Sequence, residues 1–334
     1  MCCPDGRPGR VGPGSPSTLP QPRRAGGSSR AAARGIYGRL VASAEQDAGG
    51  RVVGPLSLGA LDVAATLSAM RRGSGDPTYR VDEAGRHWRV LHTPTGPATV
   101  RVLPRPQAGT VEADAWGDGA DWALDQLPQL LGADDDPTGF EPRPEHPVLA
   151  GAWHVHRHWR VGRGGVVWQA LPSAIIEQKV TGQEAFGAQR RLARRFGTPA
   201  PGPAADLGLR LPVDHARSAT LLRAARVASG LERTIARPDA DARLRSVPGI
   251  GVWTSAEVRQ RAHGDADAVS FGDYHVARSI GWALIGEQTD DDAVAELLEP
   301  YAGHRYRVQR LLELAGVRHP QHGPRMAPRA HLPR

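Results

Sequence analysis

The sequence predicts an α+β protein in which a small N-terminal α/β domain is followed by an all-α domain. Before residue 132, short apolar runs alternate with turn-forming Gly, Pro and Asp, which is typical of strands. From Val148 onward, apolar residues recur at helical spacing and strand patterns disappear. We therefore expect a leader rich in Arg, Gly and Pro over 1–50, the α/β domain over 51–132, a linker over 133–147, the all-α domain over 148–316 and a basic tail over 317–334.

In the N-terminal domain we expect two helices, over 61–70 and 119–131, and three strands, over 79–81, 87–92 and 98–103. The second helix is indicated by apolar side chains at helical spacing, namely Trp122, Leu124, Leu127, Leu130 and Leu131. The segment 133–147 contains a run of Asp and four prolines, so we interpret it as a linker or surface loop.

Helices account for the rest of the predicted secondary structure. They are expected over 166–179, 183–196, 219–227, 240–247, 253–263, 274–285, 291–298 and 304–315. Residues 197–212, between the second and third of these helices, are rich in Pro and Gly and are expected to form a loop. The sequence contains no repeat of the solenoid kind.

The formal net charge of +7 is located in the two ends of the chain. Residues 1–35 hold six Arg and one Asp, and residues 317–334 hold four Arg and no acid, which leaves a net charge of −2 for 36–316. Basic ends attract phosphate without selectivity, so overall charge alone does not identify a DNA-binding core. Lys179 is the only lysine in the chain.

Composition excludes several other classes of protein. The only cysteines, Cys2 and Cys3, are adjacent, so neither a disulfide framework nor a cysteine-ligated zinc or iron–sulfur site is expected. No apolar run approaches the ~18 residues that a membrane-spanning helix needs, and the leader lacks the apolar stretch of a secretory signal. These features predict a cytoplasmic protein without a metal or other cofactor.

The segment 244–256, LRSVPGIGVWTSA, has the pattern of two helices joined by a tight turn. Gly249 and Gly251 permit backbone conformations and close approaches that a Cβ would prevent. Backbone N–H groups at the start of the second helix could then approach a phosphate, while Ile250 fills the space between the helices. An ordinary corner between two helices is the alternative, because Pro-Gly turns are common.

Asp273 lies 22 residues after Gly251, in the segment 269–278, VSFGDYHVAR. It follows a glycine and precedes an apolar-periodic run, which is the pattern of a helix N-cap. Taken alone, the aspartate is explained by capping. Its spacing from the hairpin favours a catalytic function.

Together these motifs resemble the helix-hairpin-helix DNA glycosylase superfamily, and most closely its DNA-3-methyladenine glycosylase II type. The hairpin VPGIGVWTSA is similar to a signature of that group, and Gly272-Asp273-Tyr274 matches the site of its catalytic Asp. Segment 170–183, ALPSAIIEQKVTGQ, is similar to the family's buried helix that ends in a DNA-facing turn. The resemblance covers 148–316 well and 56–131 loosely.

The resemblance implies a monofunctional glycosylase that acts as a monomer on double-stranded DNA containing damaged, alkylated bases. Asp273 is the implied catalytic residue. The implied DNA-binding residues are Gly249, Ile250, Gly251, Thr254, Gln178 and Lys179, and those of the base pocket are Trp253, Glu257 and Tyr274. A carboxylate beside the anomeric carbon would stabilise the oxocarbenium-like transition state and orient or deprotonate the attacking water.

Two positions depart from the family pattern and bear on the substrate. Glu257 lies at a position where the best-known member of the family has a tyrosine. Leu298 lies at a position where the family often has a pocket tryptophan. Glu257 is one helical turn after Trp253, so it either faces the flipped base or is solvated. The alternatives to an alkylated-base glycosylase are a noncatalytic DNA-binding module and a glycosylase for oxidised or mismatched bases. The lack of cysteines for a cluster argues against the endonuclease III and adenine-mismatch branches.

Overall fold

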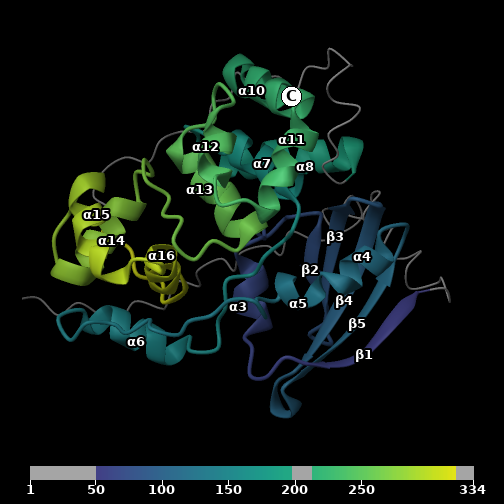
Figure 1. Cartoon of the computed structure of the whole chain (residues 1–334), viewed down its shortest axis with the longest axis horizontal. Coiled ribbons are helices and arrows are strands. Elements are labelled where there is room, and N and C mark those ends of the chain that lie inside the picture. The colour runs from purple at the N-terminus through teal and green to yellow at the C-terminus, as the bar shows by residue number, and fades with distance from the viewer. Residues whose placement is uncertain (1–49, 198–212, 321–334) are drawn as a thin grey trace, which may run out of the picture.

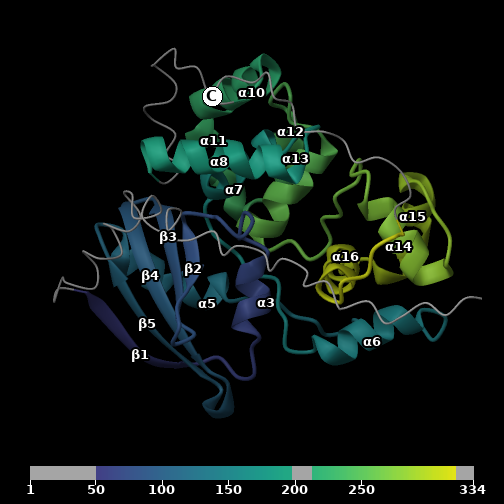
Figure 2. The same cartoon turned by 180° about the vertical axis from the view of Figure 1, so that it is seen from behind.

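The computed structural model describes residues 50–197 and 213–320. Figure 1 and its reverse view, Figure 2, show a sheet on one side of the molecule and two groups of helices beside it. Each of these three parts is organised around its own buried apolar cluster. The predicted α+β class is confirmed. The predicted loop over 197–212 lies, apart from Gly197, outside the described residues.

The sheet has five antiparallel strands in the order β1-β5-β4-β3-β2. Its strands are β1 (Arg51–Ser57), β2 (Tyr79–Val81), β3 (His87–Thr93), β4 (Gly96–Arg105) and β5 (Thr110–Trp116). The sequence predicts β2, β3 and β4. It does not predict β1, at one edge of the sheet, or β5, which lies next to it. Gly54 and Pro55 interrupt the strand pattern of β1, whose pairing with β5 is irregular between Val53 and Leu56. In β5, the acidic Glu112 and Asp114 weaken the strand signal.

Three short helices pack on the sheet: α3 (Val63–Ser68), α4 (Ala120–Asp125) and α5 (Leu127–Leu130). The last two divide the single helix that was expected over 119–131. Gln126 ends the first, and Pro128, which has no N–H to donate, lies at the start of the second. Leu124, Leu127 and Leu131 are nevertheless buried in the sheet's apolar cluster.

The first helical group surrounds α7 (Val167–Ile176), which is buried along most of its length. Around it lie α8 (Gly182–Phe196), α10 (His215–Arg226), α11 (Ala228–Glu232), η2 (Arg233–Ala236), α12 (Ala240–Arg245), α13 (Val252–Val258) and the π-helical turn η3 (Arg259–His263). Thr181 and Asp214 cap α8 and α10, accepting from the N–H of Glu184 and Arg217. This group carries the predicted hairpin between α12 and α13.

The second helical group contains α6 (Pro147–Val155), α14 (Val276–Ile285), α15 (Asp291–Leu298), η4 (Glu299–Tyr301) and α16 (Arg305–Leu314). The segment expected as a linker contributes to this packing. Phe140 belongs to the buried cluster, and the carboxylate of Asp135 pairs with the Arg307 guanidinium at 2.7 Å, with side chains only 4% and 0% exposed. Residues 133–147 are therefore anchored to α16.

No helix in the described parts of the chain is long and apolar enough to cross a membrane.

Candidate active site and nucleic-acid interface

The hairpin between α12 and α13 has the geometry that its glycines predict. Gly249 adopts a φ of +97°, and a Cβ at this position would overlap Thr220 Oγ1. Ile250 is buried in the core of the first helical group, as expected for a residue that fills the space between the helices. Gly251 is extended and exposed, with no atom near its missing Cβ, and no side chain caps α13. The first N–H groups of α13 are thus open to an outside acceptor.

The turn after α7 is fastened to this hairpin through Gln178. Its side-chain Nε2 donates to the Gly249 carbonyl at 2.9 Å and to Thr254 Oγ1 at 2.8 Å. Thr254 is only 2% exposed. The Thr254 hydroxyl lies inside the protein and joins two loops, so the expected contact of Thr254 with DNA would have to come from its backbone. Gln178 likewise uses its amide N–H groups within the protein.

Lys179 follows Gln178 at the surface. Among the described residues it is the only non-glycine residue with a positive φ, at 53°. Its side chain is exposed and forms no hydrogen bond or ion pair with any described residue. A left-handed non-glycine residue costs conformational energy, and such strain is concentrated at functional sites. The ammonium group is thus presented outward, beside the hairpin.

Asp273 is held from two sides. Its Oδ1 accepts hydrogen bonds from the backbone N–H of His275 at 2.7 Å and Val276 at 3.3 Å. The N-cap position of α14 belongs to His275, so the expectation that Asp273 occupies it is wrong. Its Oδ2 accepts from the indole Nε1 of Trp253 at 3.2 Å. Helix α14 begins at Val276, two residues later than predicted, so Asp273 precedes it by a short turn. One carboxylate oxygen thus closes the turn that leads into α14, and the other contacts Trp253.

The turn before Asp273 is braced by a contact that the sequence did not indicate. Gly272 has a φ of +86°, and its N–H donates to Asp291 Oδ2 at 2.7 Å. The Asp273 N–H donates to the Ser270 carbonyl at 3.2 Å. The glycine before the aspartate was a visible signal of special backbone geometry, but its partner lies 19 residues further along the chain.

Glu257 does not stand free to meet a base, and it is not solvated either. It is 7% exposed, its Oε2 pairs with Arg261 Nη1 at 2.8 Å, and its Oε1 accepts from Ser270 Oγ at 2.7 Å. Burial opposes the charge of Arg261, but Glu257 raises the pKa of that guanidinium above its ordinary value. Glu257 was expected either to face the flipped base or to be solvated. Instead, its carboxylate is held in a buried ion pair.

Tyr274 also departs from its expected place in a base pocket. Its side chain is 66% exposed, and the guanidinium carbon of Arg278 lies 3.8 Å from the centre of its ring. The ring therefore lies at the surface next to Asp273, stacked with a cation from α14. Leu298, at the other departure from the family pattern, is fully buried in the core of the second helical group.

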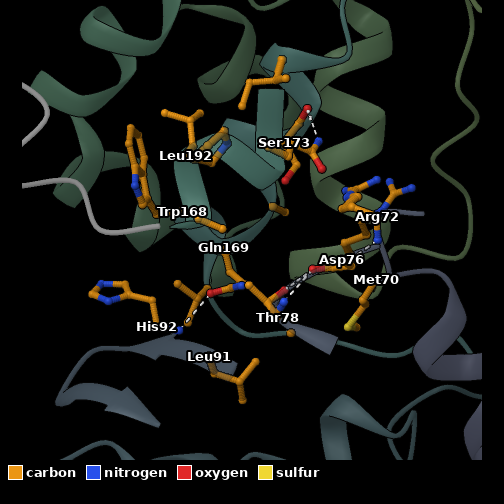
Figure 3. A pocket seen from close by; sticks show the side chains of 18 of the residues that line it. Met70, Arg72, Asp76, Thr78, Leu91, His92, Trp168, Gln169, Ser173 and Leu192 are labelled. Atoms are coloured by element: carbon orange, nitrogen blue, oxygen red, sulfur yellow. Dashed lines mark hydrogen bonds between the residues drawn. The ribbon is translucent and has the colours of Figure 1, made fainter. Parts of the chain in front are cut away.

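A cavity of about 220 Å³ lies between the sheet and the first helical group, away from Asp273. Figure 3 shows Leu91 and His92 on one side of it and Trp168, Gln169 and Ser173 on the other. Neither Asp273 nor Trp253 lines this cavity. Arg261, which pairs with Glu257, is among the residues that line it.

In residues 50–197 and 213–320, no three His, Cys, Asp or Glu side chains come together as a possible metal site.

Comparison with known proteins gives a structural likeness without a sequence match. No protein-family model and no curated protein matches the chain. The structure is similar to a 3-methyladenine DNA glycosylase from Archaeoglobus fulgidus, with a TM-score of 0.64 and 18% identity over 79% of this chain and 98% of that one. It is also similar to MBOgg1 in complex with a low-affinity DNA ligand, with a TM-score of 0.56 and 15% identity over 79% and 96%.

A third similar structure is the 8-oxoguanine glycosylase/lyase of Clostridium acetobutylicum in complex with double-stranded DNA containing cytosine opposite 8-oxoguanine. Its TM-score is 0.56, with 10% identity over 78% of this chain and 94% of that one. In each case the similarity covers 78–79% of this chain and nearly the whole of the known one. The chain thus has the fold of the helix-hairpin-helix DNA glycosylases.

Proposed function

We propose that this protein is a monofunctional DNA glycosylase that removes a damaged, alkylated base from double-stranded DNA by hydrolysing its N-glycosidic bond. The observation that carries the proposal is the carboxylate of Asp273, fixed between the Trp253 indole and the backbone of α14 beside an open hairpin. A carboxylate placed beside DNA phosphates repels them, so a module that only binds DNA gains nothing from it.

The reaction requires stabilisation of positive charge on the sugar. As the bond between the base and C1′ breaks, the sugar becomes oxocarbenium-like, and a fixed negative carboxylate lowers the energy of that state. Both oxygens of Asp273 are already held by hydrogen bonds, so the group needs little reorganisation during the reaction. The same carboxylate orients or deprotonates the attacking water. The pair of electrons in the broken bond leaves with the base.

Trp253 supports an alkylated base as the substrate. Its indole N–H is committed to Asp273, so the contact left for an extruded base is with the face of the ring. Aromatic faces attract cationic bases by roughly 0.5–2 kcal/mol per contact. A base that already carries positive charge leaves readily, and no strong general acid is then required. Extrusion of the base costs a few kcal/mol, and less when its pairing is already damaged.

The test is base release from methylated double-stranded DNA, with the released bases identified. Asp273→Asn should lower the rate of release at least about a hundredfold, as expected for loss of a fixed electrostatic group. Binding to DNA should be retained or become tighter, because a charge that repels phosphate is removed. A change within a few-fold would contradict the assignment of Asp273.

Asp290→Asn is the matched control. Asp290 caps α15 by accepting from the Ala293 N–H at 3.0 Å, and Asp273 likewise accepts from backbone N–H groups at the start of α14. Its substitution removes the same charge from a helix N-cap of the same helical group without touching Trp253. We expect base release within a few-fold of wild type. Equal losses in both variants would assign the effect to capping and would leave Asp273 without a catalytic role.

A further inference from the structure

A groove of about 460 Å³ lies next to the hairpin on the surface of α10, α11 and α12. Five exposed arginines line it: Arg223, Arg226, Arg233, Arg237 and Arg243. One edge is formed by Ser246, Val247 and Pro248, which lead directly into the hairpin turn. The labels in Figure 1 place α10, α11 and α12 together, at the end of the molecule far from α6.

The positive charge of this groove is only partly neutralised inside the protein. Asp239 pairs with Arg237 at 2.8 Å and with Arg243 at 2.9 Å. Arg223 and Arg233 donate only to backbone carbonyls, those of Pro248 at 3.3 Å and Ser229 at 3.1 Å.

Arg226 forms no hydrogen bond or ion pair with any residue that the structure describes. Within the described residues, three of the five arginines thus lack a carboxylate partner.

A general excess of basic residues does not explain the groove. Residues 36–316 carry a net charge of −2, so the arginines are concentrated here against an acidic background. Arg223 and Arg226 are in the last turn of α10, where cations stabilise the helix dipole. Arg233 and Arg237 lie outside that helix, and the dipole of α10 does not account for them.

We propose that this groove binds the phosphodiester backbone of duplex DNA, extending the interface from the hairpin across α10, α11 and α12. The inference rests on the DNA binding that the proposed function requires, and not on base release. Arginine guanidinium groups pair well with phosphate oxygens. The bond from Arg223 to the Pro248 carbonyl joins the groove to the turn, so a strand seated on the hairpin continues onto the arginines.

The experiment compares binding of an undamaged duplex of about 20 base pairs by wild type and the double variant Arg226→Gln/Arg233→Gln, over a range of KCl concentrations. Each lost phosphate contact lowers the slope of log Kobs against log salt by about 0.9, so the slope should fall by nearly two. Binding at low salt should weaken about tenfold or more. Because both side chains are exposed and unpaired with carboxylates, the midpoint of unfolding by urea should change little.

Arg51→Gln/Arg105→Gln is the control, since it removes the same charge from exposed arginines on the sheet. Its salt slope should equal that of wild type. An equal fall in both double variants, or no fall in either, overturns the groove as a DNA surface. Base release is measured in parallel: a groove-dependent slope without base release supports this inference and refutes the proposed function. Base release with an unchanged salt slope supports the proposed function and refutes the groove as a DNA surface.

Discussion

Gly249→Ala probes the backbone geometry on which the hairpin depends. Gly249 has a φ of +97°, and a Cβ there would overlap Thr220 Oγ1 and lie 3.0 Å from Thr220 Cγ2. Thr220 is 3% exposed, and its hydroxyl donates to the Ala216 carbonyl at 3.0 Å, so it cannot turn aside without losing that bond. The substitution therefore introduces both backbone strain and a steric overlap.

Both terms can be given a magnitude. A left-handed conformation costs a residue with a Cβ about 1–2 kcal/mol. Overpacking against a buried side chain costs about 1–3 kcal/mol. The free energy of unfolding should thus fall by about 2–5 kcal/mol, which is a large share of the ~5–15 kcal/mol typical of a folded protein. Adding Thr220→Ala removes Oγ1 and Cγ2 but keeps a Cβ at 3.1 Å, so it should recover most of the steric part and leave the backbone part. A double-mutant cycle in urea or guanidinium unfolding would measure this.

Gly251→Ala is the matched control for stability and the sharper probe of binding. Gly251 has a φ of −94°, and a Cβ there would meet no atom within 4 Å. Its free energy of unfolding should stay within about 1 kcal/mol of wild type. Binding of duplex DNA should nevertheless weaken, because the added methyl group stands where a phosphate would approach the N–H groups of α13. If Gly249→Ala is as stable as wild type, the account of the turn is refuted.

Lys179→Ala should weaken binding of duplex DNA and lower the slope of log Kobs against log salt by about 1, because it removes one phosphate contact. An unchanged slope would show that Lys179 is a surface residue without a DNA contact. The resemblance to helix-hairpin-helix glycosylases implies that Trp253 stands where bifunctional members place a nucleophilic lysine, so the proposed enzyme should release the base and leave the strand uncut. A borohydride-trapped protein–DNA adduct that disappears in Lys179→Ala would overturn this. Burial lowers the pKa of His263 from 6.5 to about 4. Since the unfolded state then takes up the proton first, His263 should cost stability as the pH falls from 6.5 to 4, by roughly 3 kcal/mol at most. His263→Gln should flatten the pH dependence of unfolding in this window, and identical curves would exclude the effect.

Local patterns in the sequence were sufficient for most of the helices and for the hairpin. Helix α15 has the predicted bounds, and the strained backbone at Gly249 follows from a Pro-Gly turn between two helices. The turn that places Asp273 before α14 was also readable from the glycine that precedes an apolar run, although the helix begins at Val276 and its N-cap is His275. These features are set by residues close to one another in the chain, where propensity and capping act.

Contacts between distant segments were beyond such patterns. The partner of the Thr254 hydroxyl is Gln178, 76 residues earlier, and Asp291 accepts from the Gly272 N–H. Strand β1 becomes a strand by pairing with β5, although Gly54 and Pro55 disfavour that conformation. The helical spacing of Trp253 and Glu257 did place both on one side of α13, but it did not reveal which side chain would find a buried partner.

The buried position of Glu257 explains how Asp273 is held. Glu257 Oε1 accepts from the Ser270 hydroxyl at 2.7 Å, and the Ser270 carbonyl accepts from the Asp273 N–H at 3.2 Å. Trp253, one turn earlier on α13, donates its indole N–H to the same aspartate. Two side chains of one helix thus fix the catalytic candidate from the backbone and from the carboxylate. Helix α13 belongs to the first helical group and α14 to the second, so the site forms only when both groups pack together. Glu257, which was expected in the base pocket, therefore contributes by positioning the loop that carries Asp273.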